Sequence, residues 1–242
     1  MGQYSKKGNY SGYDKNNKER EALDYYATPP QEVTNILNAI KPNFVAGDRI
    51  LDPGCGGGHL IKGLLDYKFY DATVIGTDIK DRKNWFLQNL LQYQDFGKDI
   101  ETTETTEGIA GIYTGHHLIF NYGKEYDFLL DSYPYDEVDY IIMNPPYNLL
   151  IPFIKQSLAI AKKGVLMLAR LQFLEGQKRY EEILKQTPFT DMYVYVDRIA
   201  CYKNGDFSTK PSSVQAYAWF YWDKTNPLKE GEEPRVHWLR RA

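Results

Sequence analysis

The sequence predicts one α/β domain in which helices cover both faces of a mostly parallel β-sheet. Short apolar runs alternate with segments of helical period along its 242 residues. A glycine-rich turn at residues 53–58 joins one such run to a helix, as in nucleotide-binding units. Another run, Val138–Met143, ends at Asn144-Pro145-Pro146-Tyr147. Consecutive prolines end a strand because they cannot donate backbone hydrogen bonds.

The elements follow one another without a linker that would mark a second domain. Thr28-Pro29-Pro30 precedes the first helix, and prolines suit the first turn of a helix. Strands are expected at residues 48–52, 72–77, 118–122, 138–143, 165–169, 192–196 and 214–222, and helices at residues 31–40, 59–66, 82–93, 151–161 and 175–185. Residues 97–117 are polar and irregular, and they predict a surface insertion.

Composition narrows the class of protein. The net charge is −3, so a contact with a polyanion must come from a local basic patch. Cys55 and Cys201 lie far apart and form no CxxC pair, which is typical of a reduced, cytoplasmic setting. No apolar run is long enough to span a bilayer, so we expect no membrane partner. Residues 1–20 are polar and aperiodic, and we expect a flexible arm ahead of one domain at residues 21–242.

The glycine-rich turn and the second strand predict a site for an adenosine-type ligand. The turn, PGCGGG, lets backbone amides approach a ligand, and the N-terminus of the following helix favours an anion. It is neither a P-loop nor a G-x-G-x-x-G fingerprint, because the spacing fails both patterns. Asp78 ends the second strand, where an acid can bind both hydroxyls of a ribose. The alternative is a solvated aspartate that caps the next helix.

In this order the motifs resemble those of amino-group DNA methyltransferases that use S-adenosylmethionine, especially N6-adenine enzymes of phage and prokaryotic type. The resemblance covers about residues 24 to 150, in the γ order of motifs. It rests on Tyr26-Ala27-Thr28-Pro29-Pro30, LDPGCGGG at residues 51–58, Asp78, Asp127-Phe128 and Asn144-Pro145-Pro146-Tyr147. It implies a Rossmann-like S-adenosylmethionine methyltransferase fold, with a seven-stranded, mostly parallel sheet and a C-terminal antiparallel hairpin.

The resemblance also assigns roles to the residues of these motifs. For the cofactor, it implies Tyr26, Thr28, Gly54 and Gly56 at the methionine end, Asp52 beneath the methionine, Asp78 at the ribose, and Asp127 and Phe128 at the adenine. For catalysis, it implies that Asn144 and the carbonyl of Pro145 accept hydrogen bonds from the target amine and that Tyr147 stacks on the target base. The consecutive prolines, Pro145 and Pro146, make this segment a rigid elbow at the end of the strand.

The implied chemistry explains these residue types. An exocyclic amine is a poor nucleophile because its lone pair is delocalised into the ring. Two acceptors, one for each N–H, hold the lone pair toward the methyl group by orientation and electrostatics. The base must leave its stack, and aromatic stacking worth about 1–3 kcal/mol per base offsets that cost. We hypothesise that Phe207, or another residue of the segment at residues 197–213, covers the second face of the base.

Several alternatives remain open at this point. DNA is the expected partner, RNA adenine N6-methylation is the nearest rival, and protein glutamine methylation or a non-catalytic nucleic-acid-binding subunit are more distant ones. No separate target-recognition domain is expected, because the sheet takes most of the chain after Tyr147. No metal is expected, since His116 and His117 have no cysteine or carboxylate at ligand spacing. The sequence does not indicate an oligomeric state.

Overall fold

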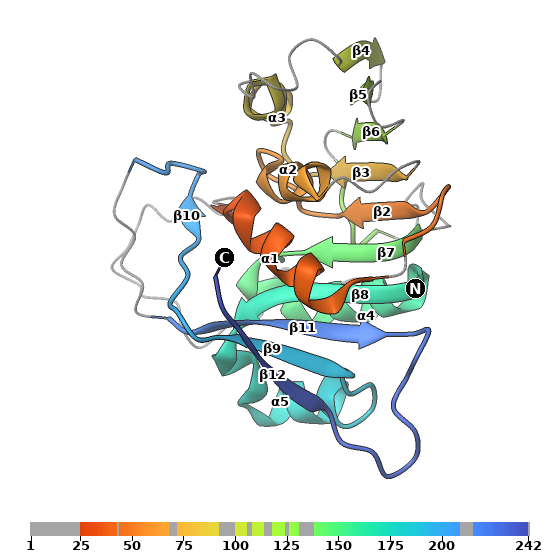
Figure 1. The fold of residues 1–242 in the computed structure, drawn as a ribbon, viewed down its shortest axis with the longest axis vertical. Coiled ribbons are helices and arrows are strands. Elements are labelled where there is room, and N and C mark those ends of the chain that lie inside the picture. The colour runs from red at the N-terminus through yellow and green to blue at the C-terminus, as the bar shows by residue number, and fades with distance from the viewer. Residues whose placement is uncertain are drawn as a thin grey trace.

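A mixed β-sheet organises the chain in the computed structural model, which describes residues 25–42, 44–67, 72–91, 100–105, 108–113, 118–123, 126–130, 138–208 and 215–241. Within these residues the sheet has ten strands in the order β12-β9-β11-β8-β7-β2-β3-β6-β5-β4 (Figure 1). The strands are β2 (Arg49–Asp52), β3 (Thr73–Thr77), β4 (Ile100–Thr105), β5 (Gly108–Tyr113), β6 (Leu118–Gly123), β7 (Val138–Met143), β8 (Ala161–Arg170), β9 (Asp191–Tyr195), β11 (Tyr217–Asp223) and β12 (Arg235–Leu239). The flexible arm expected at residues 1–20 lies outside the described residues.

Seven neighbouring strands, β6-β3-β2-β7-β8-β11-β9, are the seven that the sequence predicts. The first five run parallel, and β11 lies antiparallel between β8 and β9. This arrangement confirms the Rossmann-like fold class and the C-terminal antiparallel hairpin. The strand order reverses between β2 and β7, and ligands of open α/β sheets bind at such a switch point, beyond the carboxyl ends of the strands.

Three further strands extend the sheet beyond this core. β4 and β5 form an antiparallel hairpin on β6, within the segment that was expected to be irregular. That segment is rich in threonine, which is β-branched and favours strands, and polar residues are typical of edge strands. At the other end of the sheet, β12 pairs parallel with β9.

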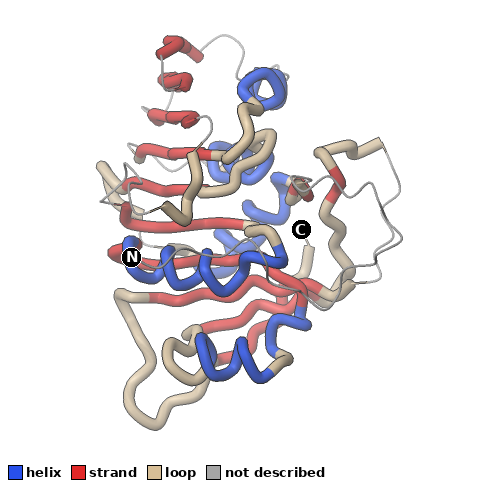
Figure 2. The backbone as a smooth tube through the Cα atoms, turned by 180° about the vertical axis from the view of Figure 1, so that it is seen from behind, coloured by secondary structure: helices blue, strands red, loops and turns tan. Residues whose placement is uncertain are grey.

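Helices cover both faces of the sheet, as Figures 1 and 2 show. α1 (Pro30–Ile40), α2 (His59–Asp66) and α3 (Lys83–Leu91) lie on one face, and α4 (Leu150–Ile160) and α5 (Gln177–Arg179) lie on the other. The helix expected at residues 175–185 is instead the short α5 followed by a π-helical turn, Tyr180–Leu184. β8 also starts earlier than expected, at Ala161, and Lys163 within it pairs with Asp48 and, at 3.6 Å, with Asp139.

Alternation along the strands divides the core into two apolar layers. Ile50, Val74 and Ile142 pack with α1 and α2 in one layer. Leu51 and Ile141 pack with α4 in the other. Successive strand residues point to opposite faces of a sheet, so each strand contributes to both layers and is covered by helices on both sides.

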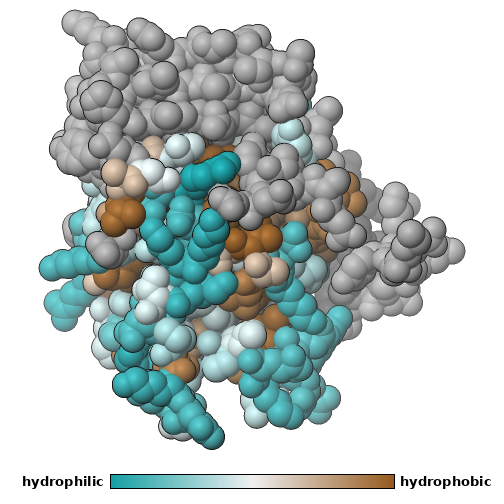
Figure 3. Space-filling model, turned by 90° about the vertical axis from the view of Figure 1, so that its right-hand side faces the viewer, coloured by the Kyte–Doolittle hydropathy of each residue, from teal (hydrophilic) through white to brown (hydrophobic). Residues whose placement is uncertain are grey.

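The two ends of the parallel strands differ in role. Their carboxyl ends, β10 (Tyr202–Lys203) and the C-terminus gather on one side of the sheet, called the carboxyl edge below, on the left of Figure 1. The opposite edge faces the viewer in Figure 3 and is mostly hydrophilic where it is described, with smaller hydrophobic patches near its middle. Among the described residues, none of the helices is long and apolar enough to cross a membrane.

Candidate functional site

The glycine-rich turn between β2 and α2 has a defined backbone conformation. Gly56 and Gly58 have φ values of +54° and +78°, which glycine adopts without strain. The amide of Cys55 donates to the carbonyl of Thr77 at 2.9 Å and ties the turn to the end of β3. Gly58 is the N-cap of α2 and offers no side-chain cap, so the first amides of this helix remain available to an acceptor.

Asp78 lies at the tip of β3 and holds this turn. Its Oδ2 accepts a hydrogen bond from the amide of Gly56 at 2.8 Å, and its Oδ1 accepts one from the amide of Lys80 at 2.9 Å. Arg82 approaches the same carboxylate at 3.5 Å. The side chain is buried and does not cap α3, which begins at Lys83. The alternative of a solvated capping aspartate is therefore wrong.

A second segment, residues 126–130, lies against Asp78 because the amide of Tyr126 donates to the Asp78 carbonyl at 3.0 Å. Asp127 accepts a hydrogen bond from the amide of Leu129 at 2.9 Å. Phe128 is 2% exposed and packs on Phe153 with ring centroids 5.0 Å apart. The Phe128 side chain thus lies in the core and does not face the carboxyl edge, where the resemblance would place an adenine ring.

The apolar residues exposed at this corner are Ile79 and Leu130. These residues are 51% and 56% exposed; Ile79 follows Asp78, and Leu130 ends the segment that the Tyr126–Asp78 hydrogen bond joins to it. The sequence shows a branched aliphatic residue directly after the strand-ending Asp78, but residue type alone does not show that its side chain is exposed.

Asp52 ends β2 beneath the glycine-rich turn. Its carboxyl group is buried and accepts a long hydrogen bond, 3.4 Å, from the amide of Gly54. Burial raises the pKa of Asp52 to about 8, and the nearby charge of Asp78 contributes in the same direction. At neutral pH Asp52 is therefore mostly protonated.

Asn144 is held by residues that lie more than fifty positions away along the chain. Its Nδ2 donates to the carbonyl of Tyr26 at 2.9 Å and to Thr28 Oγ1 at 3.2 Å, and lies 3.8 Å from Cys201 Sγ. These segments meet because β1 (Tyr26–Ala27) pairs antiparallel with β10. Since the hydrogen bonds described for this side chain all use Nδ2, the amide oxygen Oδ1 is left to accept.

Tyr147 is 46% exposed beside this amide. Its ring contacts Arg170, which ends β8, with the guanidinium carbon 5.3 Å from the ring centroid. Phe207, expected on the second face of a target base, instead contacts Tyr202 and His59, with centroids 4.5 and 5.1 Å away. The structure thus brings Arg170 to Tyr147 and places Phe207 against the glycine-rich turn.

Arg170 belongs to a polar network that sequence reasoning missed. It lies opposite Tyr217 of β11 and hydrogen-bonds with it. Tyr217 hydrogen-bonds with Cys201, and Cys201 with Thr28. Burial raises the pKa of the Cys201 thiol to about 12, so the thiol stays protonated in this network. The sequence does show a basic residue, Arg170, at the end of an apolar strand. It does not show the partners of Arg170, because they come from other segments of the chain.

Comparisons with known proteins support the fold. No protein-family model matches this sequence, and no curated protein does. Among solved structures, it resembles the methyltransferase subunit of a type I restriction-modification system from Streptococcus thermophilus, with a TM-score of 0.53 and 11% identity over 91% of this chain and 48% of that one. This chain therefore spans about half the length of that subunit.

Two other solved structures are similar. A putative RNA methyltransferase from Pyrococcus horikoshii has a TM-score of 0.51 and 16% identity, over 83% of this chain and 87% of that one. A SAM-dependent O-methyltransferase from Thermotoga maritima has a TM-score of 0.51 and 15% identity, over 86% of this chain and 69% of that one. The fold is that of the Rossmann-like methyltransferases. At these identities the likeness establishes the fold alone.

Proposed function

We propose that this protein transfers a methyl group from S-adenosylmethionine to the N6 amino group of adenine in DNA. The observation that carries this proposal is the Asn144 amide. Its nitrogen is used by Tyr26 and Thr28, so its oxygen is preset as an acceptor beside the half-exposed ring of Tyr147. This arrangement lies after β7, at the switch point next to the glycine-rich turn.

The residues at the carboxyl edge fit the cofactor. The uncapped first turn of α2 suits its carboxylate, and Asp78 suits its ribose hydroxyls. Ile79 and Leu130 offer exposed apolar surface for its adenine. Asp52 stays at the tip of β2, beneath the turn. When bound, the cofactor supplies an electrophilic methyl group on a sulfonium.

Asn144, Pro145 and Tyr147, called the Asn144 clamp below, then orient the acceptor amine. Oδ1 of Asn144 and the carbonyl of Pro145 each accept one N–H, which points the nitrogen lone pair toward the methyl group. Tyr147 stacks on the extruded base, and Arg170 covers the other face of that tyrosine ring. The bound cofactor would supply the methyl group that the oriented nitrogen accepts, and the amine proton would leave along the hydrogen bond to Asn144 or to solvent.

The choice of DNA rests on the order of motifs, with the Thr28-Pro29-Pro30 segment ahead of the glycine-rich turn. RNA adenine is the second candidate, because the fold is shared with a restriction-modification methyltransferase subunit and with a putative RNA methyltransferase. The deciding experiment incubates the protein with labelled S-adenosylmethionine and unmethylated DNA, RNA or protein extract, followed by mass spectrometry of the product. N6-methyladenine in DNA is expected. N4-methylcytosine, or label found only in RNA or protein, would overturn the proposal.

The Asn144→Ala variant tests the clamp. We expect methyl transfer to fall at least about 100-fold, the size typical for loss of one preorganised polar group in an active site. Cofactor affinity, measured by calorimetry, should stay close to that of the unmodified protein. The matched control is Asn226→Ala, in the exposed turn after β11 at the opposite edge of the sheet. A fully active Asn144→Ala variant would exclude this mechanism.

A further inference from the structure

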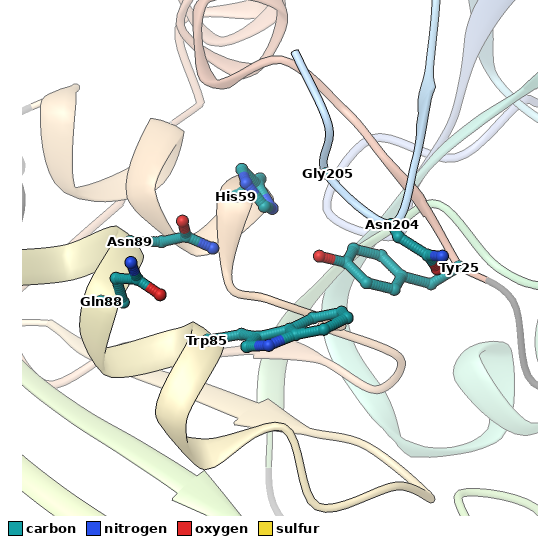
Figure 4. A pocket seen from close by; sticks show the side chains of 7 residues that line it. All are labelled: Tyr25, His59, Trp85, Gln88, Asn89, Asn204 and Gly205. Carbon is teal, nitrogen blue, oxygen red and sulfur yellow. The ribbon is translucent and has the colours of Figure 1, made fainter. Parts of the chain in front are cut away.

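A pocket of about 200 Å³ lies beside the glycine-rich turn and is lined in part by His59, the first residue of α2 (Figure 4). Four separate segments form it: the residue before β1, the start of α2, one side of α3 and the loop after β10. The side chains that line it include Tyr25, His59, Trp85, Gln88, Asn89 and Asn204. This pocket is called the α3 pocket below.

One wall of the α3 pocket is aromatic. The rings of Tyr25 and Trp85 lie with their centroids 6.0 Å apart. The guanidinium carbon of Arg82 lies 4.6 Å from the Tyr25 centroid and 5.8 Å from that of Trp85. Trp85 is 44% exposed, so part of its indole is open to a ligand. Such a surface favours a flat ring that can stack.

The remaining walls are polar but uncharged. They carry the carboxamides of Gln88, Asn89 and Asn204 (Figure 4). The Nδ2 atom of Asn89 donates a hydrogen bond to the carbonyl of Gly57 at 2.7 Å, so its Oδ1 atom can accept one from a ligand. His59 is neutral, because burial lowers its pKa to about 4 and Lys62 acts in the same direction. Among the described residues that line the pocket, none carries a carboxylate. Uncharged donors and acceptors around a stacking surface match the edge of a nucleobase.

The α3 pocket and the Asn144 clamp are joined by consecutive residues. The carbonyl of Tyr25 accepts from the amide of Asn204 at 2.9 Å, and the carbonyl of Tyr26 accepts from Asn144. The segment from Tyr25 to Tyr26 therefore borders both sites. A strand with its target base at the clamp is well placed to present another base to the pocket.

The ring of Tyr25 lines the α3 pocket and also contacts the glycine-rich turn. A Cβ added to Gly56 would lie 2.5 Å from this ring, so the ring packs directly on the turn. The amide of Gly56 faces Asp78, while the carbonyl of Gly57 is covered by Asn89. The turn thus presents its amide side to the proposed ribose site and its carbonyl side to the pocket.

We propose that the α3 pocket binds an unpaired base of the substrate strand, close to the target base, and so contributes to sequence preference. Adenine suits it best, because asparagine and glutamine carboxamides pair with its N6 and N7 edge. This inference rests on the proposed function. It places base recognition on α3 and the loop after β10, in a domain that has no separate recognition module among its described residues.

The test compares Trp85→Ala and Gln88→Ala with the unmodified protein. Binding of short fluorescein-labelled single-stranded oligonucleotides is measured by anisotropy, and S-adenosylmethionine binding by calorimetry. We expect Trp85→Ala to weaken oligonucleotide binding about tenfold, which corresponds to the loss of one base stack. Trp85→Phe should restore most of the affinity. Gln88→Ala should reduce the preference for adenine beside the target while total affinity changes little.

The matched control is Trp238→Ala, which removes a 73% exposed tryptophan from β12, at the far end of the sheet from α3. It should leave oligonucleotide binding unchanged. An equal loss in both tryptophan variants, or none in Trp85→Ala, would overturn the proposal. A Trp85→Ala variant that loses cofactor affinity would assign the pocket to the cofactor instead. These readouts need no methyl transfer, so they are independent of the labelling experiment that tests the proposed function.

Discussion

Two carboxyl groups end neighbouring parallel strands at the site, and their surroundings differ. Asp78 accepts hydrogen bonds from the amides of Gly56 and Lys80. Asp52 has one long hydrogen bond, and burial raises its pKa to about 8. Asp78 lies at the tip of β3, where the ribose is proposed to bind.

The raised pKa of Asp52 predicts a pH-dependent cost to stability. In the unfolded chain this group ionises near its ordinary pKa of about 4, whereas in the folded protein it keeps its proton up to about pH 8. The folded state binds more protons across this window, so its stability falls as pH rises. Asp52→Asn removes this pH-dependent cost. We expect the free energy of unfolding of the variant at pH 8 to be at least about 1 kcal/mol higher than that of the unmodified protein.

Urea unfolding at a series of pH values measures this effect. The difference between Asp52→Asn and the unmodified protein should be close to zero at pH 4 and should grow toward pH 8. Asp139→Asn is the control, because it changes a partly exposed carboxylate with no comparable burial. A difference that stays constant with pH would show that Asp52 is ionised in the folded protein.

At the scale of elements, an ion-pair cluster at the start of β12 attaches this strand to β9. Arg235 donates from Nε and Nη2 to the two oxygens of Asp191, both at 2.8 Å, and His237 Nε2 lies 2.8 Å from the same carboxylate. Burial opposes ionisation of Asp191, but the hydrogen bonds from Arg235 and His237 prevail and lower its pKa. After the strand, Arg241 pairs with the buried Glu32 of α1 at 2.8 Å.

Arg235→Ala should therefore destabilise the protein by about 1–3 kcal/mol, the range for hydrogen bonds to a charged group. Thermal unfolding monitored by circular dichroism measures the loss, and Arg240→Ala, at an exposed position after β12, is the control. The lowered pKa of Asp191 means that the cluster contributes above the ordinary pKa of an aspartate and is lost as pH falls through the lowered value. If both substitutions destabilised the protein equally, the effect would come from the change in net charge and not from the ion-pair cluster.

At the scale of the whole molecule, the central strands carry the proposed site and the outer strands extend the sheet. Each of β2, β3, β7, β8, β9 and β11 contributes side chains to both apolar layers, and Leu239 of β12 packs in one of them. In the described part of the chain, the hairpin of β4 and β5 pairs with the central strands at β6, the outermost of them. The strands that carry the proposed site, β2, β3 and β7, do not pair with this hairpin.

We predict that replacing residues 100–113 with a short glycine-serine linker leaves a folded domain. Unfolding should remain cooperative, with a lower midpoint because the edge of β6 loses its partner. Cofactor affinity should change less than threefold, or about 0.65 kcal/mol, since the site lies at β2, β3 and β7. Circular dichroism melting and calorimetry provide the two measurements. Loss of the cooperative transition would show that the hairpin belongs to the core.

Local patterns were enough to predict much of the fold and part of the site. The glycine-rich turn, Asp78 and the residues at 144–147 each follow an apolar strand directly, so their place at the carboxyl edge comes from short-range sequence alone. The ends of β7 and α2 agree with the prediction for the same reason. The edge strand β4 is polar, IETTET, and β5 contains two glycines, so the sequence pattern of residues 97–117 predicts an irregular insertion where the structure has a hairpin.

The sequence by itself determined the parallel core, its helices and the order of the motifs, because period and turn chemistry act over a few residues. Only the tertiary structure decided which side chains meet. The pairing of β1 with β10 brings Thr28 to Asn144, and the pairing of β8 with β11 brings Tyr217 to Arg170. Burial, which sets the pKa of Asp52 and withdraws Phe128 from the surface, is likewise a property of the packed chain. These contacts join distant segments, and no local pattern encodes them.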